Sequence, residues 1–357
     1  MTRRTVSPAE LLTHADRVSL LNALTRRGFI GTASAVLAAA SLAARASAQA
    51  TPDASPAASP VAGQWPRTVH GSLGDVTIEA KPARVVAVSD WYEVDYLMAQ
   101  GVKPILYGYT NRWGAGVSPW LVAAGGEELE TYDLEGSAEP DLEVIAAANP
   151  DLIVADPYIA EQVVSQLNAI APTVGLPTPY SGSSDWREAQ VLTGQATGDE
   201  EAAAAAIAET ERAIADGRTQ LAPYADRTVT IAYTSAYNGG SLFFATDDGQ
   251  EATLIRELGV RFKGHTDNSP QSMETVNTLQ DADILLSFDD EDNQKYLEQN
   301  PLFQSLPVAG NGQYQTLSTI ASRAIFAPST LSVRWVIPEL VEAIATAAEG
   351  KGKKVAG

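Results

Sequence analysis

One long stretch, residues 198–223, constrains the fold more than any other part of the chain. Asp199 is a favourable N-cap whose carboxylate can accept from the first turn, and two glutamates follow it at the positive end of the helix dipole. Five consecutive alanines, Ala202–Ala206, then leave no preference that competes with a helix. At roughly 1.5 Å per residue, about 22 residues form a rod of roughly 33 Å, which is about the width of a small domain.

The apolar pattern of this stretch is narrow. Ile207, Ile214 and Leu221 recur every seventh residue on an otherwise charged or small surface, and Pro223 ends the pattern. Gly217 is a position at which the helix could bend or end early. Taken alone, the segment is equally consistent with an ordinary exposed helix. Because the sequence on both sides has α/β patterning, we expect a rigid connector between two lobes.

The composition limits the classes of function. The chain has 357 residues, 45% of them hydrophobic, a formal net charge of -20 and no cysteine. So acidic a chain repels nucleic acid and anionic membranes, so no nucleic-acid partner is expected. The lack of cysteine excludes disulfides, thiol nucleophiles and a lipid-modified cysteine from this sequence.

The N-terminus has the features of an export signal. Residues 25–48 contain the pair Arg26-Arg27, a moderately apolar run and the small-residue exit Ala46-Ser47-Ala48. The pattern resembles a twin-arginine signal, and its alternative is a retained membrane anchor. We therefore expect a signal peptide over residues 1–48, a Pro/Ala/Ser tether over residues 49–66, and export to the periplasm or cell surface.

The rest of the chain alternates strands and helices, which favours parallel sheets. A first α/β lobe is expected over residues 67–186, a bridging helix region over 187–225 and a second α/β lobe over 226–357. In the first lobe the patterns predict a hairpin at 68–78, strands at 84–89, 105–108 and 151–155, and helices at 93–100 and 141–148. In the second they predict strands at 227–233, 242–245 and 283–287, and helices at 251–258, 273–279 and 338–348.

Aromatic residues gather after the first-lobe strands. Ligands of open α/β sheets bind beyond the carboxyl ends of the strands, so these positions are candidates for a binding site. Each aromatic residue taken singly is at least as consistent with core packing. The candidates from the first lobe are Trp91, Tyr92, Tyr109, Arg112, Trp113 and Tyr158.

Several motifs together resemble one family. They are KPARVVAVS at 81–89, GVKPI at 101–105, EPDLEVIAAANPDLIVA at 139–155, LNAIAPTV at 167–174 and LIRELGV at 254–260. In this order they are similar to the iron–siderophore substrate-binding proteins of ABC importers, the group that binds ferrichrome, ferric citrate or vitamin B12. The resemblance covers residues 67–348 and implies two Rossmann-like α/β lobes joined by one long helix.

Catalytic motifs are missing from the sequence. It contains no G-x-S-x-G elbow, no phosphate-binding G-x-x-x-x-G-K-[ST] loop and no H-E-x-x-H pair. His70 and His265 are far apart in the sequence and are expected at the surface, and the acidic run 289–292 is expected to be a solvated loop. We therefore predict no catalytic residues and no metal site.

A ferric siderophore explains what remains. Its iron is already wrapped by its own oxygens, so a receptor needs flat aromatic walls and one or two cations rather than metal ligands. Arg112 suits that role for a chelate that is often anionic, and Tyr237, Arg323 and Phe326 are expected to face it from the second lobe. No intrinsic cofactor is expected, and iron would be carried as the chelate. The alternatives are a receptor for vitamin B12, haem or another metal chelate, and an exported enzyme on the same scaffold.

The resemblance also implies a partner. Receptors of this family dock on a dimeric ABC permease in the cytoplasmic membrane through one surface carboxylate per lobe. Glu143 matches the first-lobe position and Glu274 matches the second, and both are expected in the first turn of a helix. Glutamate is favoured there by the helix dipole as well. The receptor itself is expected to be a monomer.

Overall fold

The computed structural model describes residues 63–110, 116–134, 139–157, 159, 161–177, 185–235, 241–266, 268–289 and 291–355, all within one compact unit, Pro60–Gly357. The signal peptide predicted for residues 1–48 and most of the tether lie outside the described residues.

The first lobe is built on a five-stranded parallel sheet, with the strands in the order β5-β4-β3-β6-β7. A separate antiparallel hairpin, β1 and β2, precedes it, as the sequence predicts. The strands are β1 (Arg67–Gly71), β2 (Gly74–Ile78), β3 (Val85–Ala87), β4 (Leu106–Tyr109), β5 (Thr131–Asp133), β6 (Leu152–Ala155) and β7 (Thr173–Gly175). The helices are α2 (Glu93–Ala99), α3 (Pro119–Ala123), α4 (Leu142–Ala147), α5 (Glu161–Ile170) and α6 (Trp186–Thr197).

The central strand β3 shows why this segment forms a buried strand. Its β-branched valines alternate between the two faces, and none of its residues is more than 3% exposed. Val86 packs with Ile145 of α4 and Leu167 of α5 on one face, while Val85 packs with Leu97 of α2 on the other. Helices therefore cover both faces, and only the strand ends remain for a ligand.

The second lobe repeats this plan. Its sheet has the parallel order β10-β8-β11-β12, and β9 pairs antiparallel with β8. The strands are β8 (Thr228–Ser235), β9 (Ser241–Phe244), β10 (Arg261–Phe262), β11 (Ile284–Asp289) and β12 (Tyr314–Ser318). The helices are α8 (Gln250–Glu257), the 3-10 helix η5 (Met273–Asp281), α9 (Glu291–Glu298), α10 (Pro301–Gln304), α11 (Pro307–Gly310), α12 (Thr319–Phe326) and α13 (Thr330–Ala348).

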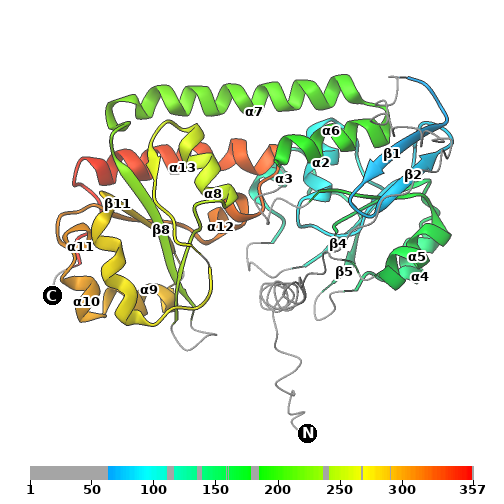
Figure 1. Ribbon diagram of the computed structural model, residues 1–357. Helices are drawn as coiled ribbons and strands as arrows, with labels where there is room; N and C mark the ends of the chain where they lie inside the picture. The colour runs from blue at the N-terminus through cyan, green and yellow to red at the C-terminus, as the bar shows by residue number, and fades with distance from the viewer. Residues whose placement is uncertain are drawn as a thin grey trace, which may run out of the picture. The chain divides into compact units, whose positions relative to one another are not determined.

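The predicted connector is present as α7 (Glu200–Leu221), followed by a 3-10 turn, η3 (Ala222–Tyr224). In Figure 1 it runs along α6 and then along α13, and both packings are close. At the α6 crossing, a Cβ on Gly194 would lie only 2.6 Å from the Cβ of Ala203. The alanine run therefore serves close helix packing as well as helix propensity.

Two expectations about this helix are wrong in detail. Asp199 is the N-cap residue, but its carboxylate accepts from Lys81 Nζ at 2.6 Å and makes no cap hydrogen bond to the first turn. Gly217 neither bends nor ends the helix. It is buried, and a Cβ there would meet Leu258, Ile337 and Val341 at 2.8, 3.0 and 3.3 Å, so glycine allows α7 to approach the second lobe.

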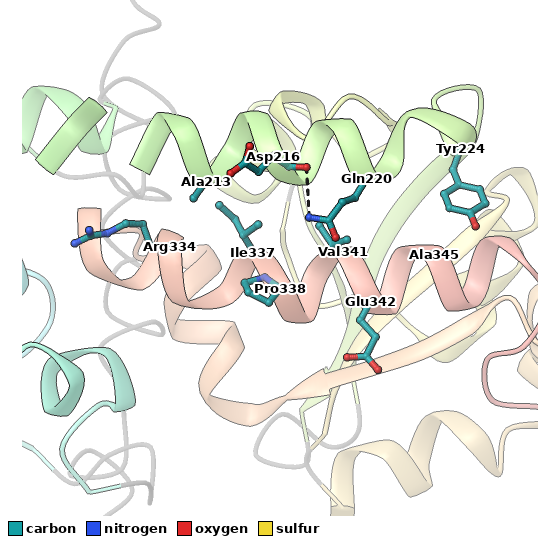
Figure 2. A pocket seen from close by; sticks show the side chains of 10 residues that line it. All are labelled: Ala213, Asp216, Gln220, Tyr224, Arg334, Ile337, Pro338, Val341, Glu342 and Ala345. Carbon is teal, nitrogen blue, oxygen red and sulfur yellow. Dashed lines mark hydrogen bonds between the residues drawn. The ribbon is translucent and has the colours of Figure 1, made fainter. Parts of the chain in front are cut away.

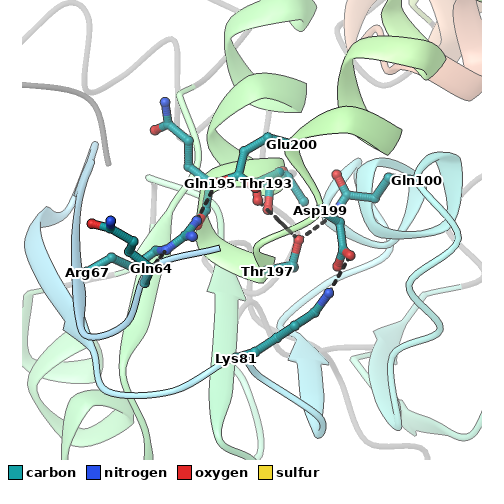
Figure 3. Close-up of polar contacts among 10 residues, drawn as sticks. Gln64, Arg67, Lys81, Gln100, Thr193, Gln195, Thr197, Asp199 and Glu200 are labelled. Carbon is teal, nitrogen blue, oxygen red and sulfur yellow. Dashed lines mark hydrogen bonds and ion pairs between the residues drawn. The ribbon is translucent and has the colours of Figure 1, made fainter. Parts of the chain in front are cut away.

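The N-terminal end of α7 is tied to the first lobe by polar contacts (Figure 3). Arg67 of β1 is 4% exposed and donates from Nη1 to the carbonyl of Gln195 at 2.8 Å and to Glu200 Oε1 at 2.5 Å. Gln100, at the C-terminal end of α2, donates to Thr197 Oγ1 at 2.7 Å. The hairpin, α2 and the α6–α7 junction are thereby joined.

The last helix begins earlier than the sequence predicts. The sequence predicts a helix over residues 338–348, whereas α13 starts at Thr330 and includes Pro338. A reciprocal capping box between Ser329 and Ser332 fixes the true start. The N-terminal half of α13 precedes Pro338, and the proline hides it from prediction because it resembles a helix start. This half packs Val333 and Val336 into the same core cluster as Tyr96 and Trp120 of the first lobe. The two lobes therefore share one hydrophobic core.

Candidate ligand-binding site at the strand ends

The carboxyl ends of the two sheets meet at Arg323. This residue lies on α12, just after β12, and is only 3% exposed. Its Nη2 donates to the carbonyl of Trp91, which follows β3, at 3.0 Å, and its Nη1 donates to Ser118 Oγ. The guanidinium also lies over the Trp120 ring, 5.2 Å from its centroid. One side chain of the second lobe is thus held entirely by the first.

A buried carboxylate lies beside this contact. Asp95 of α2 is fully buried, and its Oδ2 accepts from Trp120 Nε1 at 2.7 Å and from Ser329 Oγ at 2.8 Å. Burial raises the pKa of Asp95 to about 6, while the charge of Arg323 acts in the opposite direction. Because Ser329 caps α13, Asp95 links the first lobe to the start of the last helix.

Further buried hydrogen bonds support the contact between the two lobes. Tyr96 donates its hydroxyl to the carbonyl of Pro328 at 2.9 Å. Gln190 of α6 donates to Gln100 at 3.0 Å and accepts from Thr330 Oγ1 at 2.5 Å. All of these residues are buried. Buried polar groups that are satisfied in this way fix one geometry.

A second buried carboxylate belongs to Glu93, the first residue of α2, which is the helix that follows β3. Both oxygens of Glu93 accept from Ser89 Oγ, at 3.0 and 2.9 Å, and the Tyr92 amide donates to Oε2 at 3.2 Å. Burial, and then the charge of Asp156 after β6, raise the pKa of Glu93 well above its ordinary value. The first-lobe strand ends are therefore rich in carboxyl groups.

The second lobe contributes an aromatic cluster. The Tyr233 ring stacks on Phe243 at 5.4 Å between centroids and meets the edges of Phe288 and Phe326, each at 5.7 Å. Phe288 and Phe326 are 5.5 Å apart. The rings come from β8, β9, β11 and α12, so they gather at one end of the second sheet.

The predicted site residues have different locations. Trp91, Tyr109 and Phe326 are half-buried at strand ends or in α12, and Arg323 is buried among them. Tyr92 is only 1% exposed and packs edge-on against Tyr96, so its ring belongs to the core. The remaining candidates lie outside the described residues: Arg112, Trp113, Tyr158 and Tyr237.

Sequence reasoning missed several of the residues that build this region. Phe288 could have been found, because it stands at the end of a predicted strand, as the chosen aromatic residues do. The sequence predicts Tyr233 only as the last residue of a strand. No local signal identifies Asp95, because an acidic residue inside an amphipathic helix is normally solvated.

The residues considered for metal binding have other surroundings. His70 is paired with Asp75 in the exposed hairpin at 2.7 Å, and the His265 ring stacks on Phe244 at 5.1 Å. Three residues of the acidic run belong to regular elements rather than to a loop. Asp289 ends β11, and Glu291 and Asp292 open α9, where acidic residues suit the helix dipole.

A groove of about 520 Å³ lies away from the strand ends, between α7 and α13 (Figure 2). Its floor is apolar and its rim carries both signs of charge. Its walls come from α7, the turn η3 and α13, and none of the predicted ligand residues that the structure describes lines it. It is lined by Ala213, Asp216, Gln220, Tyr224, Arg334, Ile337, Pro338, Val341, Glu342 and Ala345.

The two candidate docking residues are exposed, one on each lobe. Glu143 is in the first turn of α4, whose N-cap Asp141 accepts from the Glu143 and Val144 amides. Glu274 is in the first turn of η5, capped by Ser272. The second element is a 3-10 helix rather than an α-helix, but both carboxylates keep the helix-start position that the sequence predicts.

Two mainly parallel sheets with meeting carboxyl ends, joined by one long helix, define the architecture of a two-lobed substrate-binding protein. The chain belongs to the periplasmic binding protein family, which matches it over residues 100–319. The structure of a periplasmic solute binding protein from Mycobacterium smegmatis superposes with a TM-score of 0.67 at 23% identity, covering 79% of this chain and 98% of that one. Streptococcus pneumoniae PiaA in complex with ferrichrome gives a TM-score of 0.65 at 21% identity, covering 79% and 99%.

The names of the relatives found by sequence describe siderophore-binding and ferric-citrate-binding proteins. The probable siderophore-binding lipoprotein YfiY of Bacillus subtilis is 26% identical over 266 residues, which are 69% of this chain and 78% of that protein. The Fe(3+)-citrate-binding protein YfmC of the same organism is 25% identical over 251 residues, 69% and 76% of the two chains. Within the part of the chain that the structure describes, no helix is long and apolar enough to cross a membrane.

Proposed function

We propose that this protein is the extracytoplasmic receptor of an ABC importer and that its cargo is a ferric siderophore. The observation that carries the proposal is the contact of Arg323 with the Trp91 carbonyl, which brings the carboxyl ends of both sheets to one place. The relatives' names, siderophore-binding and Fe(3+)-citrate-binding, support a ferric chelate as cargo. No chemistry on the cargo is required for this role.

The chelate would lie between half-buried aromatic surfaces of the two lobes. Trp91 and Tyr109 supply the surface of the first lobe, and Phe326 with Tyr233 supplies that of the second. Flat rings suit the bulky organic periphery of a chelate whose iron is already coordinated. We further propose that Arg112, Trp113, Tyr158 and Tyr237 complete this site.

Direct binding tests the proposal. Titration of the purified protein with a panel of ferric siderophores should quench tryptophan fluorescence saturably, with one chelate bound per chain and recovered unchanged. The iron-free siderophores serve as matched controls and should bind more weakly. Preferential binding of vitamin B12 or haem would redirect the assignment within the family. Conversion of the chelate into a new product would make the protein an enzyme.

We also propose that Glu143 and Glu274 dock the receptor on a dimeric permease in the cytoplasmic membrane. Both are exposed and each opens a helix of a different lobe. Charge reversal, Glu143→Lys with Glu274→Lys, should leave chelate binding unchanged and abolish chelate-dependent ATP hydrolysis by the reconstituted importer.

A matched control separates docking from general charge. Glu201→Lys with Glu342→Lys makes the same change at two exposed glutamates, on α7 and α13. This control should stimulate the ATPase normally. If the docking variant also stimulated it normally, the two carboxylates would have no docking role.

The location follows from the same assignment. The relatives' names describe a lipoprotein and, for the ferric enterobactin-binding protein FepB of Escherichia coli, a periplasmic protein. We propose export through a twin-arginine signal over residues 1–48, because the sequence has the paired arginine but no cysteine for lipid attachment. Replacing Arg26-Arg27 by two lysines should retain the precursor in the cytoplasm.

A further inference from the structure

Asp95 connects elements that come from distant parts of the chain. It is fully buried in α2, and its Oδ2 accepts from Trp120 Nε1 of α3 at 2.7 Å and from Ser329 Oγ, the N-cap of α13, at 2.8 Å. A carboxylate accepts stronger hydrogen bonds than a neutral oxygen does. Asp95 therefore ties both α3 and the start of α13 to the first lobe.

The helix α3 depends on such an anchor. It has only five residues, Pro119–Ala123, and a helix of that length is not stable by itself. The Trp120 ring packs against Trp335 of α13, and this apolar contact alone allows several ring orientations. The hydrogen bond from Trp120 to Asp95 selects among them, because it forms in only a narrow range of geometries.

The anchored helix in turn holds Arg323 of the second lobe. Its Nη1 donates to the hydroxyl of Ser118, the N-cap of α3, and its guanidinium lies over the Trp120 ring, 5.2 Å from the centroid. The Ser118 side chain makes no cap hydrogen bond to α3, so its hydroxyl serves the contact between the lobes instead. The position of the guanidinium therefore depends on the position of α3.

Arg323 then reaches the proposed binding site. Its Nη2 donates to the carbonyl of Trp91 at 3.0 Å, and the amide of Trp91 donates to Ser89 Oγ at 3.2 Å. The backbone of Trp91 is thus held by its own lobe at the amide and by the second lobe at the carbonyl. Trp91 is half-buried and supplies an aromatic surface of the proposed site, so the place of this surface depends on Arg323.

We propose that Asp95 is a positioning residue for the binding site, and that it sets the place of the Trp91 ring through α3 and Arg323. Because it is fully buried, Asp95 makes no contact with a ligand. It acts as a support, and a binding side chain is placed accurately only when its supporting contacts hold it. The inference rests on the proposed function, which assigns Trp91 to the ligand.

The charge of Asp95 gives this arrangement a measurable signature. Burial raises the pKa of Asp95 to about 6. Its Oδ1 is buried and has no hydrogen-bond partner among the described residues, so a proton can bind there while Oδ2 keeps both of its hydrogen bonds. Protonation then removes the negative charge that acts on Arg323. The place of the guanidinium, and of Trp91, should respond to this change.

The other titratable groups around Asp95 can be distinguished from it. Asp90 after β3, Tyr96 of α2 and Tyr107 of β4 also interact with its charge, and α3 carries no titratable side chain. Burial raises the pKa of Tyr96 and of Tyr107, so neither of them titrates near pH 6. Asp90 is unchanged in a variant of Asp95, and any effect of Asp90 would persist there.

Fluorine NMR of protein labelled with 5-fluorotryptophan tests the signature without a ligand. The variant Trp91→Phe identifies the Trp91 resonance. In the unmodified protein this resonance should shift with pH, with a midpoint near the pKa of about 6. In Asp95→Asn, which keeps an oxygen that can accept from Trp120, the shift should be lost. A Trp91 resonance with the same pH dependence in both proteins would overturn the inference.

An internal control accompanies this measurement. Trp186 of α6 lies beneath the guanidinium of Arg187, 4.2 Å from its ring centroid, and makes none of the contacts described above. Its resonance, identified with Trp186→Phe, should stay in place over the same pH range. A shift of both resonances together would show a general change of the fold and would also overturn the inference.

Binding measurements test the consequence for a ligand. The probes are ferric citrate, a ferric tris-hydroxamate and a ferric tris-catecholate, titrated at about pH 7.5, where Asp95 is charged. Asp95→Ala should weaken the tightest of the three by about tenfold or more, because binding must then also order Trp91. Asp95→Asn restores the hydrogen-bond acceptor and should bind within about threefold of the unmodified protein.

A matched control separates positioning from a general loss of buried hydrogen bonds. Thr210 of α7 is buried and donates to the carbonyl of Thr330 in α13 at 3.1 Å, without contact to Arg323 or Trp120. Thr210→Val removes this bond at nearly constant volume and should change the affinity by less than about twofold. An equal loss of affinity in Thr210→Val and Asp95→Ala would overturn the positioning role.

The remaining outcomes are distinct. If a chelate bound to Asp95→Ala as tightly as to the unmodified protein, Asp95 would have no positioning role and the siderophore receptor would stand. Binding of none of the three chelates to the unmodified protein would overturn the proposed function and this inference together. If Asp95→Ala does not fold, Trp120→Phe replaces it, because it keeps an aromatic ring and loses the N–H that Asp95 accepts. Unchanged affinity in that variant would overturn the inference.

Discussion

Trp91 and Tyr92 are adjacent in the chain but differ in burial, because the backbone directs their side chains to different surroundings. Trp91 stays half-buried at the strand end and accepts from Arg323 through its carbonyl. Tyr92 is the N-cap of α2, and its ring turns into the core against Tyr96. Sequence reasoning identifies both as aromatic residues that follow a strand. It cannot separate them, because the separation depends on the angle at which α2 leaves the sheet.

Asp95 gives the stability of the protein a specific pH dependence. Its pKa is about 6 when folded and 3.8 ordinarily, so between these values the folded state binds more protons than the unfolded state. This contribution to stability is fully present below about pH 4 and is lost as the pH rises through about 6. Over that pH range the free energy of unfolding of the unmodified protein should fall by on the order of 2–3 kcal/mol relative to that of Asp95→Asn.

Urea unfolding at several pH values measures this difference. Asparagine keeps an oxygen that can accept from Trp120 and Ser329, so the variant changes the charge with little change in shape. Burial raises the pKa of Glu251 to about 7. The change of unfolding free energy with pH that Glu251 causes should therefore remain in both proteins. Parallel stability curves for the two proteins from pH 4 to pH 7 would show that Asp95 does not titrate as assigned.

At the scale of elements, the sequence predicts α7 well because its signals are local. N-cap, alanine run and proline place it at 199–221, and the structure has Glu200–Leu221. The start of α13 is missed because Pro338 resembles a helix start, although the true start at Thr330 depends on the Ser329–Ser332 capping box. The 3-10 character of η5 has no sequence signal of its own.

Gly217 tests how closely α7 packs on the second lobe. Leucine there would clash with Leu258, Ile337 and Val341, because even a Cβ would approach to 2.8–3.3 Å. Gly217→Leu should destabilise the protein by about 1–3 kcal/mol despite the better helix propensity of leucine. Denaturant titration measures the change, with Ala205→Leu at an exposed position of α7 as the control. A Gly217→Leu protein as stable as the control would show that this interface is loose.

At the scale of the whole molecule, two lobes follow from sequence but their shared core does not. Each strand and helix has a local pattern, whereas the packing of Trp120 against Trp335, with ring centroids 5.3 Å apart, joins residues distant in the chain. The same is true of the hydrogen bonds from Tyr96 to Pro328 and from Ser329 to Asp95. Long-range contacts of this kind have no signature in a single sequence.

The shared core and the buried hydrogen bonds between the lobes predict that one lobe moves little relative to the other. One continuous core and several buried hydrogen bonds would have to break for a wide hinge motion, and α7 is a single rigid connection. Small-angle X-ray scattering with and without a bound ferric chelate should therefore show a change in radius of gyration of no more than about 1 Å. A large contraction on binding would contradict the prediction that the lobes move little.

The central claim is that the protein carries a ferric siderophore, and the most direct measurement is what it carries from its own host. The protein should be purified without denaturation from iron-limited culture, and the bound molecule analysed by mass and by visible absorption. The account predicts about one iron(III) chelate per chain, with the charge-transfer absorption of oxygen-coordinated iron. A protein that repeatedly carries an iron-free molecule of another class, or returns an added chelate chemically altered, would contradict it.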